Sequence, residues 1–187
     1  MYFTSPGPAN TRAVMETAAA EAVKRGISTI VAASNTGQTV EILLEETRKA
    51  GYTGSLVCVS HVNGFVHDGE NEMDDAVRRR LEEAGIRICT AAHALSGTER
   101  GISRKFQGAY PVEVIAHTLR MLGQGTKVCV EIAIMALDGG YTGYGRPLIA
   151  VGGSGRGADT AALISPGYSH SVFETRIHEI LCKPNLF

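Results

Sequence analysis

The sequence lacks several features that would each point to a particular class of protein. Charge of one sign is not in excess, because 18 lysines and arginines are balanced by 19 aspartates and glutamates. The net charge of −1 argues against a general nucleic-acid binder. No apolar run reaches about 18 residues, so we expect no membrane span. Residues 1–6 lack the basic flank and apolar stretch of a signal peptide. We therefore expect a cytoplasmic protein.

Cysteine is sparse and widely spaced. Cys58, Cys89, Cys129 and Cys182 lie far apart, and none belongs to a Cys-x-x-Cys pair. Three of them lie within apolar strand or helix patterns, where a buried free thiol is the usual state. The spacing predicts a reduced protein with no zinc or other metal site.

Common catalytic signatures are missing as well. The chain shows no Ser-His-Asp order and no paired-carboxylate motif, so nothing in it identifies a nucleophile. Its one basic cluster, residues 78–80, lies between Asp74-Asp75 and Glu82-Glu83 and is typical of a solvated helix face. No nucleic-acid partner is expected.

The pattern that is present alternates between helix and strand. A length of 187 residues with 44% hydrophobic content is typical of one globular domain, residues 1–187. The expected helices cover about 10–25, 40–51, 73–85 and 111–122, and the expected strands cover 27–33, 55–60, 86–92, 148–151 and 159–165. Residues 126–137 alternate like a strand, but their length favours a helix. Residues 176–183 fit a strand or a short helix, and residues 94–110 are the least regular.

This alternation predicts a three-layer α/β/α sandwich around a mostly parallel sheet of five or more strands. In such sheets ligands bind outside the carboxyl ends of the strands, so the residues that follow each strand are the candidates for a site. Residues 34–39, Ser-Asn-Thr-Gly-Gln-Thr, follow the first strand and precede a helix. We call them the Ser/Thr loop. Their hydroxyls and the free amides of the helix suit a phosphate, although a threonine there can also serve only as a helix cap.

A glycine-rich run follows a later strand. Residues 152–160, the glycine loop, read Gly-Gly-Ser-Gly-Arg-Gly-Ala-Asp-Thr. Glycines permit turns that point several amides one way, and Arg156 adds a charged fork suited to phosphate. The run lacks the lysine of a Walker loop and the spacing of a dinucleotide fingerprint, so ATP hydrolysis is not supported. The segment is predicted to form a wide hairpin that binds an anion, and the alternative is a hairpin chosen for turn geometry alone.

Three further side chains are candidates at the strand ends. His61 and His93 follow two other strands, where they can contact a ligand ring, act as acid or base, or have only a structural role. Glu131 is the one charge in an otherwise apolar run. It is expected to pair with a buried cation, with a place in the crevice as the alternative.

The chain also resembles a known family. The stretches TIVAASNTGQTVEILLEET, GSLVCVSHVNGF and PLIAVGGSGRGADTAALISP, in this order, resemble the C-terminal α/β domain of pyruvate kinase. Together with AAHALSGTERGISRKFQGAYPVEVIAHTLRMLGQGTKVCVEIAIMAL they resemble, over about the full length, the stand-alone pyruvate kinase α/β domain proteins of archaea and some bacteria. The catalytic barrel of pyruvate kinase has no counterpart here, so pyruvate kinase activity is not implied.

The resemblance carries expectations about the ligand. In pyruvate kinase the domain binds a sugar-phosphate effector, and the phosphate loop of that enzyme corresponds to Ser34, Thr36, Gly37 and Thr39. The loop that closes over the effector corresponds to residues 152–160. Gln38 stands where the effector loop often carries a basic residue, and the chain has no tryptophan for the closing loop. The stand-alone family is associated with flavin mononucleotide (FMN), so the resemblance implies FMN as cofactor.

The expected binding residues follow from both lines of argument. They are Ser34, Asn35, Thr36, Gly37, Gln38, Thr39, His61, Asn63, Gly64, Phe65, His93, Gly152, Gly153, Ser154, Gly155, Arg156, Gly157, Asp159 and Thr160. Besides FMN binding, the sequence leaves open a sugar-phosphate or nucleotide sensor without chemistry, a flavin-dependent oxidoreductase, and a structural role. A homo-oligomer is compatible with each of these alternatives.

Overall fold

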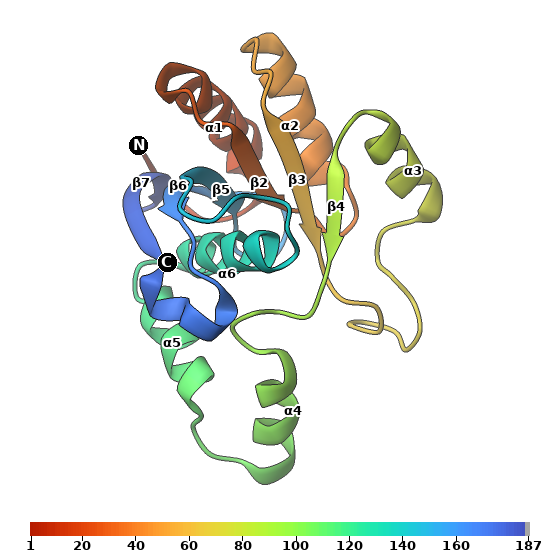
Figure 1. Ribbon diagram of the computed structural model, residues 1–187, viewed down its shortest axis with the longest axis vertical. Helices are drawn as coiled ribbons and strands as arrows, with labels where there is room; N and C mark the ends of the chain where they lie inside the picture. The colour runs from red at the N-terminus through yellow and green to blue at the C-terminus, as the bar shows by residue number, and fades with distance from the viewer. Residues whose placement is uncertain (186–187) are drawn as a thin grey trace.

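The computed structural model describes residues 1–185, which form seven strands, six α-helices and two short 3-10 helices (Figure 1). The strands are β1 (Tyr2–Phe3), β2 (Thr29–Ala33), β3 (Ser55–Ser60), β4 (Arg87–Thr90), β5 (Leu148–Gly152), β6 (Thr160–Ser165) and β7 (Arg176–Pro184). The helices are η1 (Pro8–Asn10), α1 (Thr11–Arg25), α2 (Gln38–Lys49), α3 (Asp75–Glu83), α4 (Gly97–Phe106), α5 (Pro111–Arg120), α6 (Gln124–Asp138) and η2 (Ser169–Glu174). Within the described residues no helix is both long and apolar enough to cross a membrane.

The strands form one sheet in the order β1-β7-β6-β5-β2-β3-β4. β2 pairs in parallel with β3 on one side and with β5 on the other, and β4 continues the parallel set beside β3. β6 runs antiparallel to both of its neighbours, and β1 pairs in parallel with β7. The prediction of a mostly parallel sheet is confirmed. β5 and β6 form the predicted hairpin around the glycine loop.

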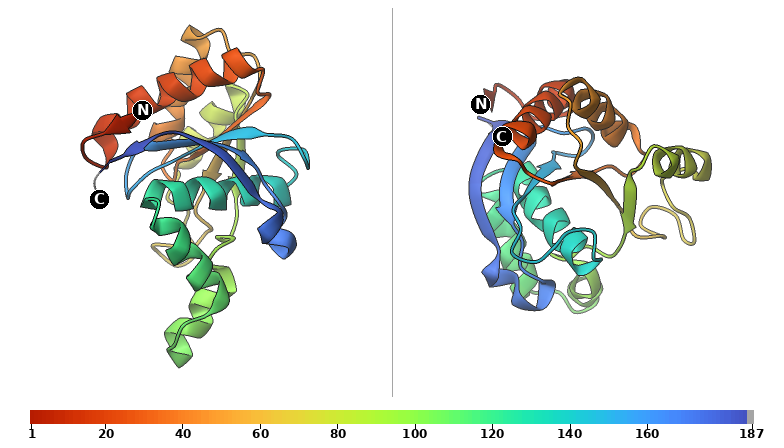
Figure 2. Two further views of the ribbon diagram at one scale, coloured as in Figure 1. Left: turned by 90° about the vertical axis from the view of Figure 1, so that its left-hand side faces the viewer. Right: turned by 45° about the horizontal axis from the view of Figure 1, so that its top comes forward.

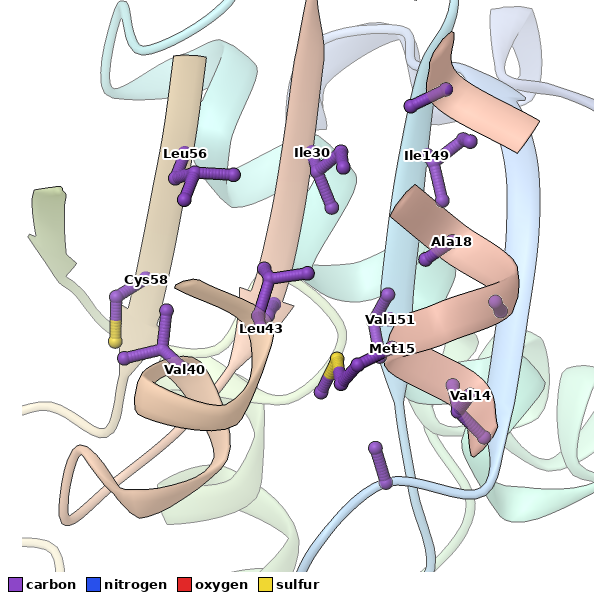
Figure 3. Close-up of a cluster of buried hydrophobic side chains, with 14 of the residues drawn as sticks. Val14, Met15, Ala18, Ile30, Val40, Leu43, Leu56, Cys58, Ile149 and Val151 are labelled. Carbon is purple, nitrogen blue, oxygen red and sulfur yellow. The ribbon is translucent and has the colours of Figure 1, made fainter. Parts of the chain in front are cut away.

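Helices cover both faces of the sheet, which completes the three-layer sandwich. The left view of Figure 2 shows α1 on one side of the strands and α6 on the other, with α5 and α4 extending away beyond α6. α1 and α2 pack on β2, β3 and β5 through side chains such as Met15, Leu43 and Ile30 (Figure 3). The opposite core includes Val31 of β2 and Ile134 of α6. Residues 30–33 of β2 are all apolar, as expected for a strand that is covered on both faces.

Two undecided segments take a definite form in the tertiary structure. Residues 126–137 lie in α6, whose residues are buried almost all round because it packs between the sheet and α5. Residues 176–183 form a strand, β7, which supplies the pairing partner for β6. All four cysteines are free and buried, whereas the sequence pattern indicates burial for three of them.

Residues 94–110, expected to be the least regular part of the chain, contain a regular helix. The segment contains α4, in which Gly101 is an interior helical residue. Contacts with α5 stabilise this helix: Ser103 Oγ donates to Glu113 Oε1 at 2.6 Å, and Glu99 Oε2 accepts from the Glu113 amide at 3.0 Å. These bonds join residues ten or more positions apart, so a local pattern of helix-weakening glycines does not reveal them.

The topology creates a switch point between β2 and β5. From β2 the chain passes through α2 to β3 and α3 to β4, and it then returns through α4, α5 and α6 to pair β5 with the other side of β2. The connections that follow β2 and β5 therefore separate, and a crevice forms outside their carboxyl ends. The Ser/Thr loop and the glycine loop are the segments that leave these two strands.

Candidate functional site

A cavity of about 470 Å³ lies at this switch point. Its volume falls in the range of about 300–1,000 Å³ typical of small-molecule pockets. The Ser/Thr loop and the glycine loop both line it, together with side chains from β3, the segment after it, and helices α4, α5 and α6. Two segments more than a hundred residues apart thus face the same space.

The Ser/Thr loop is fixed against the start of α2. The Ser34 hydroxyl accepts a bond from the amide of Val40 at 3.4 Å, and the Ser34 amide donates to the carbonyl of Val59 at 3.0 Å. Ser34, Thr36 and Thr39 all line the cavity. The amides of Gln38 and Thr39 at the start of α2 have no intrahelical acceptor, so hydroxyls and helix amides are presented together.

Gly37 has a packing role that the sequence did not reveal. Its φ of +92° lies in the left-handed region, and a Cβ placed there would lie 2.6 Å from Cγ1 of Val77. The residue faces α3 and is not part of the cavity lining. Glycine is required here because the turn into α2 lies directly against α3.

The glycine loop is anchored by Asp159, which is fully buried. Its carboxylate accepts from the amides of Gly7 at 3.0 Å and Ser154 at 3.1 Å and from the Thr160 hydroxyl at 2.8 Å. Gly157 approaches η1 so closely that a Cβ would lie 2.7 Å from the Cα of Pro8. These contacts fix the shape of the loop, and Gly153, Gly155, Arg156 and Gly157 line the cavity.

The start of α6 forms the wall beside the glycine loop. A Cβ at Gly125 would lie 2.1 Å from the Thr160 hydroxyl, so only glycine allows the first turn of α6 to approach β6 this closely. Gln124, Lys127 and Val128 line the cavity. The positive ends of two helices, α2 and α6, thus lie at one cavity, and each favours an anion.

Three aromatic rings cluster at another part of the lining. The ring centroid of His61 lies 3.8 Å from that of Phe65 and 5.0 Å from that of His93. The side chain of Asn35 donates to His61 Nε2 at 3.1 Å, so the ring proton is on Nδ1, which donates to Glu72 Oε1 at 2.5 Å. Both ring nitrogens of His61 are therefore hydrogen-bonded, which fixes the orientation of the ring beside Phe65 and His93.

A buried ion pair closes the deep side of the cavity. The ammonium of Lys127 pairs with the carboxylate of Glu131 four residues on, and both side chains are buried. The second carboxylate oxygen of Glu131 accepts from the amide of Leu95 at 3.0 Å. Glu131 thus has a buried partner, as predicted, and it also lines the cavity. Burial lowers the pKa of Lys127 and also that of His93.

The structure sorts the predicted residues by position. Those that line the cavity are Ser34, Asn35, Thr36, Gln38, Thr39, His61, Phe65, His93, Gly153, Gly155, Arg156 and Gly157. Those outside the lining are Gly37, Asn63, Gly64, Gly152, Ser154, Asp159 and Thr160. The amide oxygen of Asn63, for example, accepts from the side chain of Asn71 at 2.7 Å.

Four charged lining residues were not predicted: Glu72, Arg100, Arg120 and Lys127. None of them directly follows a strand, so the search of strand ends did not reach them. The sequence did contain a signal that could have identified Lys127. It lies four residues before Glu131, the charge predicted to be buried, and therefore on the same helix face. Among residues 1–185 no group of three histidine, cysteine or acidic side chains is placed to hold a metal ion.

Known proteins that resemble this chain show the family to which it belongs. The family model described as "Pyruvate kinase, alpha/beta domain" matches residues 12–164. The chain belongs to this family. Among solved structures, a pyruvate kinase from Cryptosporidium parvum is 15% identical, with 75% of this chain and 20% of that chain covered and a TM-score of 0.38. Pyruvate kinase from the same organism in complex with ADP is 18% identical, with 82% and 23% covered and a TM-score of 0.40. The chain thus spans about a fifth of the length of these enzymes.

Proposed function

We propose that this pyruvate kinase α/β domain protein binds a small phosphorylated ligand with a planar ring, and that FMN is this ligand. The observation that carries the proposal is the division of one cavity into two kinds of lining. Hydroxyls, glycine amides and helix N-termini gather at the Ser/Thr and glycine loops, and aromatic rings gather around His61.

The phosphate end has donors of three types. Thr36 and Thr39 supply hydroxyls, the glycine loop supplies backbone amides, and Arg156 supplies a guanidinium that has no carboxylate within 4 Å among the described residues. Amides and guanidinium groups bind phosphate oxygens through charge-assisted bonds. A monophosphate placed here would be held without a lysine or a metal ion.

The ring end suits a flat aromatic system. Phe65 is 39% exposed, and its ring stacks at a tilt against both histidines. Such rings bind the face of another aromatic group. A bound flavin would supply hydride and electron transfer. The residues of this chain would hold its phosphate and cover part of its ring.

Binding measurements with three ligands test both ends at once. FMN, riboflavin and inorganic phosphate are titrated into the purified protein, and riboflavin serves as the ring without the phosphate. We expect FMN to bind at least about tenfold more tightly than riboflavin, because charge-assisted bonds to the phosphate are lost in the latter. Equal affinities, or no binding of either flavin, would overturn FMN as the ligand.

Variants separate the two ends of the cavity. Thr36→Asp places a carboxylate beside the phosphate and is expected to weaken FMN but not riboflavin, whereas Thr53→Asp adds the same charge at an exposed position before β3 and serves as control. Phe65→Ala is expected to weaken both flavins by about threefold to tenfold and to leave phosphate binding unchanged. If Phe65→Ala has no effect while Thr36→Asp does, a sugar-phosphate or nucleotide sensor becomes the better conclusion.

A further inference from the structure

One wall of the cavity carries a concentration of positive charge that the proposed phosphate site does not use. Arg100 of α4, Arg120 of α5 and Lys127 of α6 line the same cavity from three consecutive helices. These helices follow β4 and precede β5, whereas the Ser/Thr loop opens α2, which packs on the other face of the sheet. The three cations therefore approach the cavity from the side opposite to α2.

The two arginines have no carboxylate partner within 4 Å among the described residues. The Nε of Arg120 donates to Gln124 Oε1 at 2.8 Å, and the Arg100 guanidinium lies 5.8 Å from the ring centroid of Phe65. Both contacts hold the guanidinium groups at the cavity and leave donors free, because each guanidinium has five N–H groups.

Among the described residues two carboxylates line the cavity with these three charges: Glu131, which pairs with Lys127, and Glu72, which bonds to His61. The positive charges of Arg100 and Arg120 act together with burial to lower the pKa of Lys127. Both guanidinium groups thus act on the ammonium of Lys127, and all three cations line one cavity. Like charges crowded in a partly buried site are unfavourable unless an anion joins them.

We propose that Arg100, Arg120 and Lys127 form a second subsite in the cavity that binds an oxyanion, a carboxylate or a phosphate. The proposal rests on the proposed function in sharing its cavity, but it uses different residues. With FMN as the ligand, which carries a single phosphate, the oxyanion is a separate small anion bound beside the ring. The alternative is the second acidic group of a ligand other than FMN that is held by the Ser/Thr loop.

Calorimetric titration with inorganic phosphate tests the subsite in the protein without flavin. We expect two phosphates per wild-type chain. The double variant Arg100→Gln/Arg120→Gln is expected to retain one and to weaken the other by at least about tenfold, since each arginine bond to an anion is charge-assisted. Arg104→Gln, an exposed arginine on α4 outside the cavity lining, is the matched control and should bind as wild type does.

The Thr36→Asp variant keeps this test distinct from that of the proposed function. If Thr36→Asp loses one of the two bound phosphates and the double variant Arg100→Gln/Arg120→Gln loses the other, both proposals hold. If wild type binds one phosphate and the arginine variant binds it equally well, the second subsite is wrong and the Ser/Thr loop site stands. If phosphate is lost only in the arginine variant, the subsite stands and the proposed phosphate loop is wrong. If the double variant has an altered urea midpoint, the phosphate titration is repeated with the single variant Arg120→Gln.

A second arm identifies the source of the oxyanion. The phosphate titration is repeated on protein saturated with FMN. One phosphate that still binds, and is lost in the double arginine variant, shows a separate anion beside the flavin. Loss of both phosphates upon FMN binding, with FMN weakened by the arginine variant, shows that one ligand reaches both subsites. Loss of both without any effect of the arginine variant on FMN or phosphate overturns the proposal.

Discussion

Asn35 and His61 join the two strand ends that frame the ring side of the cavity. The amide oxygen of Asn35 accepts from the backbone N–H of His61 at 3.2 Å, and its amide nitrogen donates to the His61 ring at 3.1 Å. One side chain thus fixes both the backbone and the ring of a residue that follows the neighbouring strand. The second bond sets the tautomer of His61, which in turn directs its Nδ1–H to Glu72.

Replacing Asn35 by alanine should loosen this link. Two hydrogen bonds are lost at about 0.5–1.5 kcal/mol each, so the free energy of unfolding is expected to fall by about 1–3 kcal/mol. Because the His61 ring is no longer held, binding of FMN should weaken more than binding of inorganic phosphate. Urea unfolding and ligand titration measure the two effects. Asn63→Ala, which removes one exposed bond from the same loop region, is the control.

Asp159→Asn tests the anchor of the glycine loop. The amide nitrogen would face donors at a site where the carboxylate now accepts three bonds, from Gly7, Ser154 and Thr160. We expect a loss of at least about 2 kcal/mol in the free energy of unfolding, because a buried bond to a charged acceptor contributes more than a neutral one. Hydrogen exchange should accelerate at the Gly7 and Ser154 amides. A variant as stable as wild type would show that the loop does not depend on Asp159.

Glu131→Gln leaves the buried ammonium of Lys127 without its counter-charge. Breaking a buried pair from one side typically costs about 3–5 kcal/mol, and we expect a fall of that size in urea unfolding. In the double variant Lys127→Met/Glu131→Gln the charge is removed, and the glutamine oxygen can still accept from the amide of Leu95. The double variant should therefore regain most of the stability. If it is no more stable than Glu131→Gln, the cost does not come from the unpaired charge.

His93 should make the fold less stable in acid. Burial, reinforced by the charges of His61, Lys127 and Arg100 and opposed by Glu131, lowers its pKa from the ordinary 6.5. The unfolded chain then binds more protons than the folded chain, so stability falls as the pH drops from about 6.5 through the lowered pKa and levels off below it.

The variant His93→Gln cannot take up this proton. Its urea midpoint is expected to depend less steeply on pH over that interval than the wild-type midpoint. His117→Gln, an exposed histidine on α5, serves as control and should retain the wild-type slope. An unchanged slope in His93→Gln would show that another group causes the acid dependence.

Local patterns were sufficient for much of the fold. The apolar stripes and closing glycines of α1 and α3, and the short β-branched runs of β2 and β3, are readable because each element carries its own period and its own ends. The α/β alternation then implied a parallel sheet and placed the Ser/Thr and glycine loops at its carboxyl edge. These inferences need only residues close together in the chain.

The roles of single residues depended on partners far away in sequence. Nothing near Gly37 shows that Val77 of α3 lies against it, and nothing near Asp159 shows that Gly7 donates to it. The sequence by itself determined the types of most elements, the α/β architecture and the two loops at its edge. Only the tertiary structure decided which loop residues face the cavity, that α4 is a helix, and that three helices bring Arg100, Arg120 and Lys127 together. The reason is that backbone period is a local property, whereas a cavity lining is set by how distant segments pack.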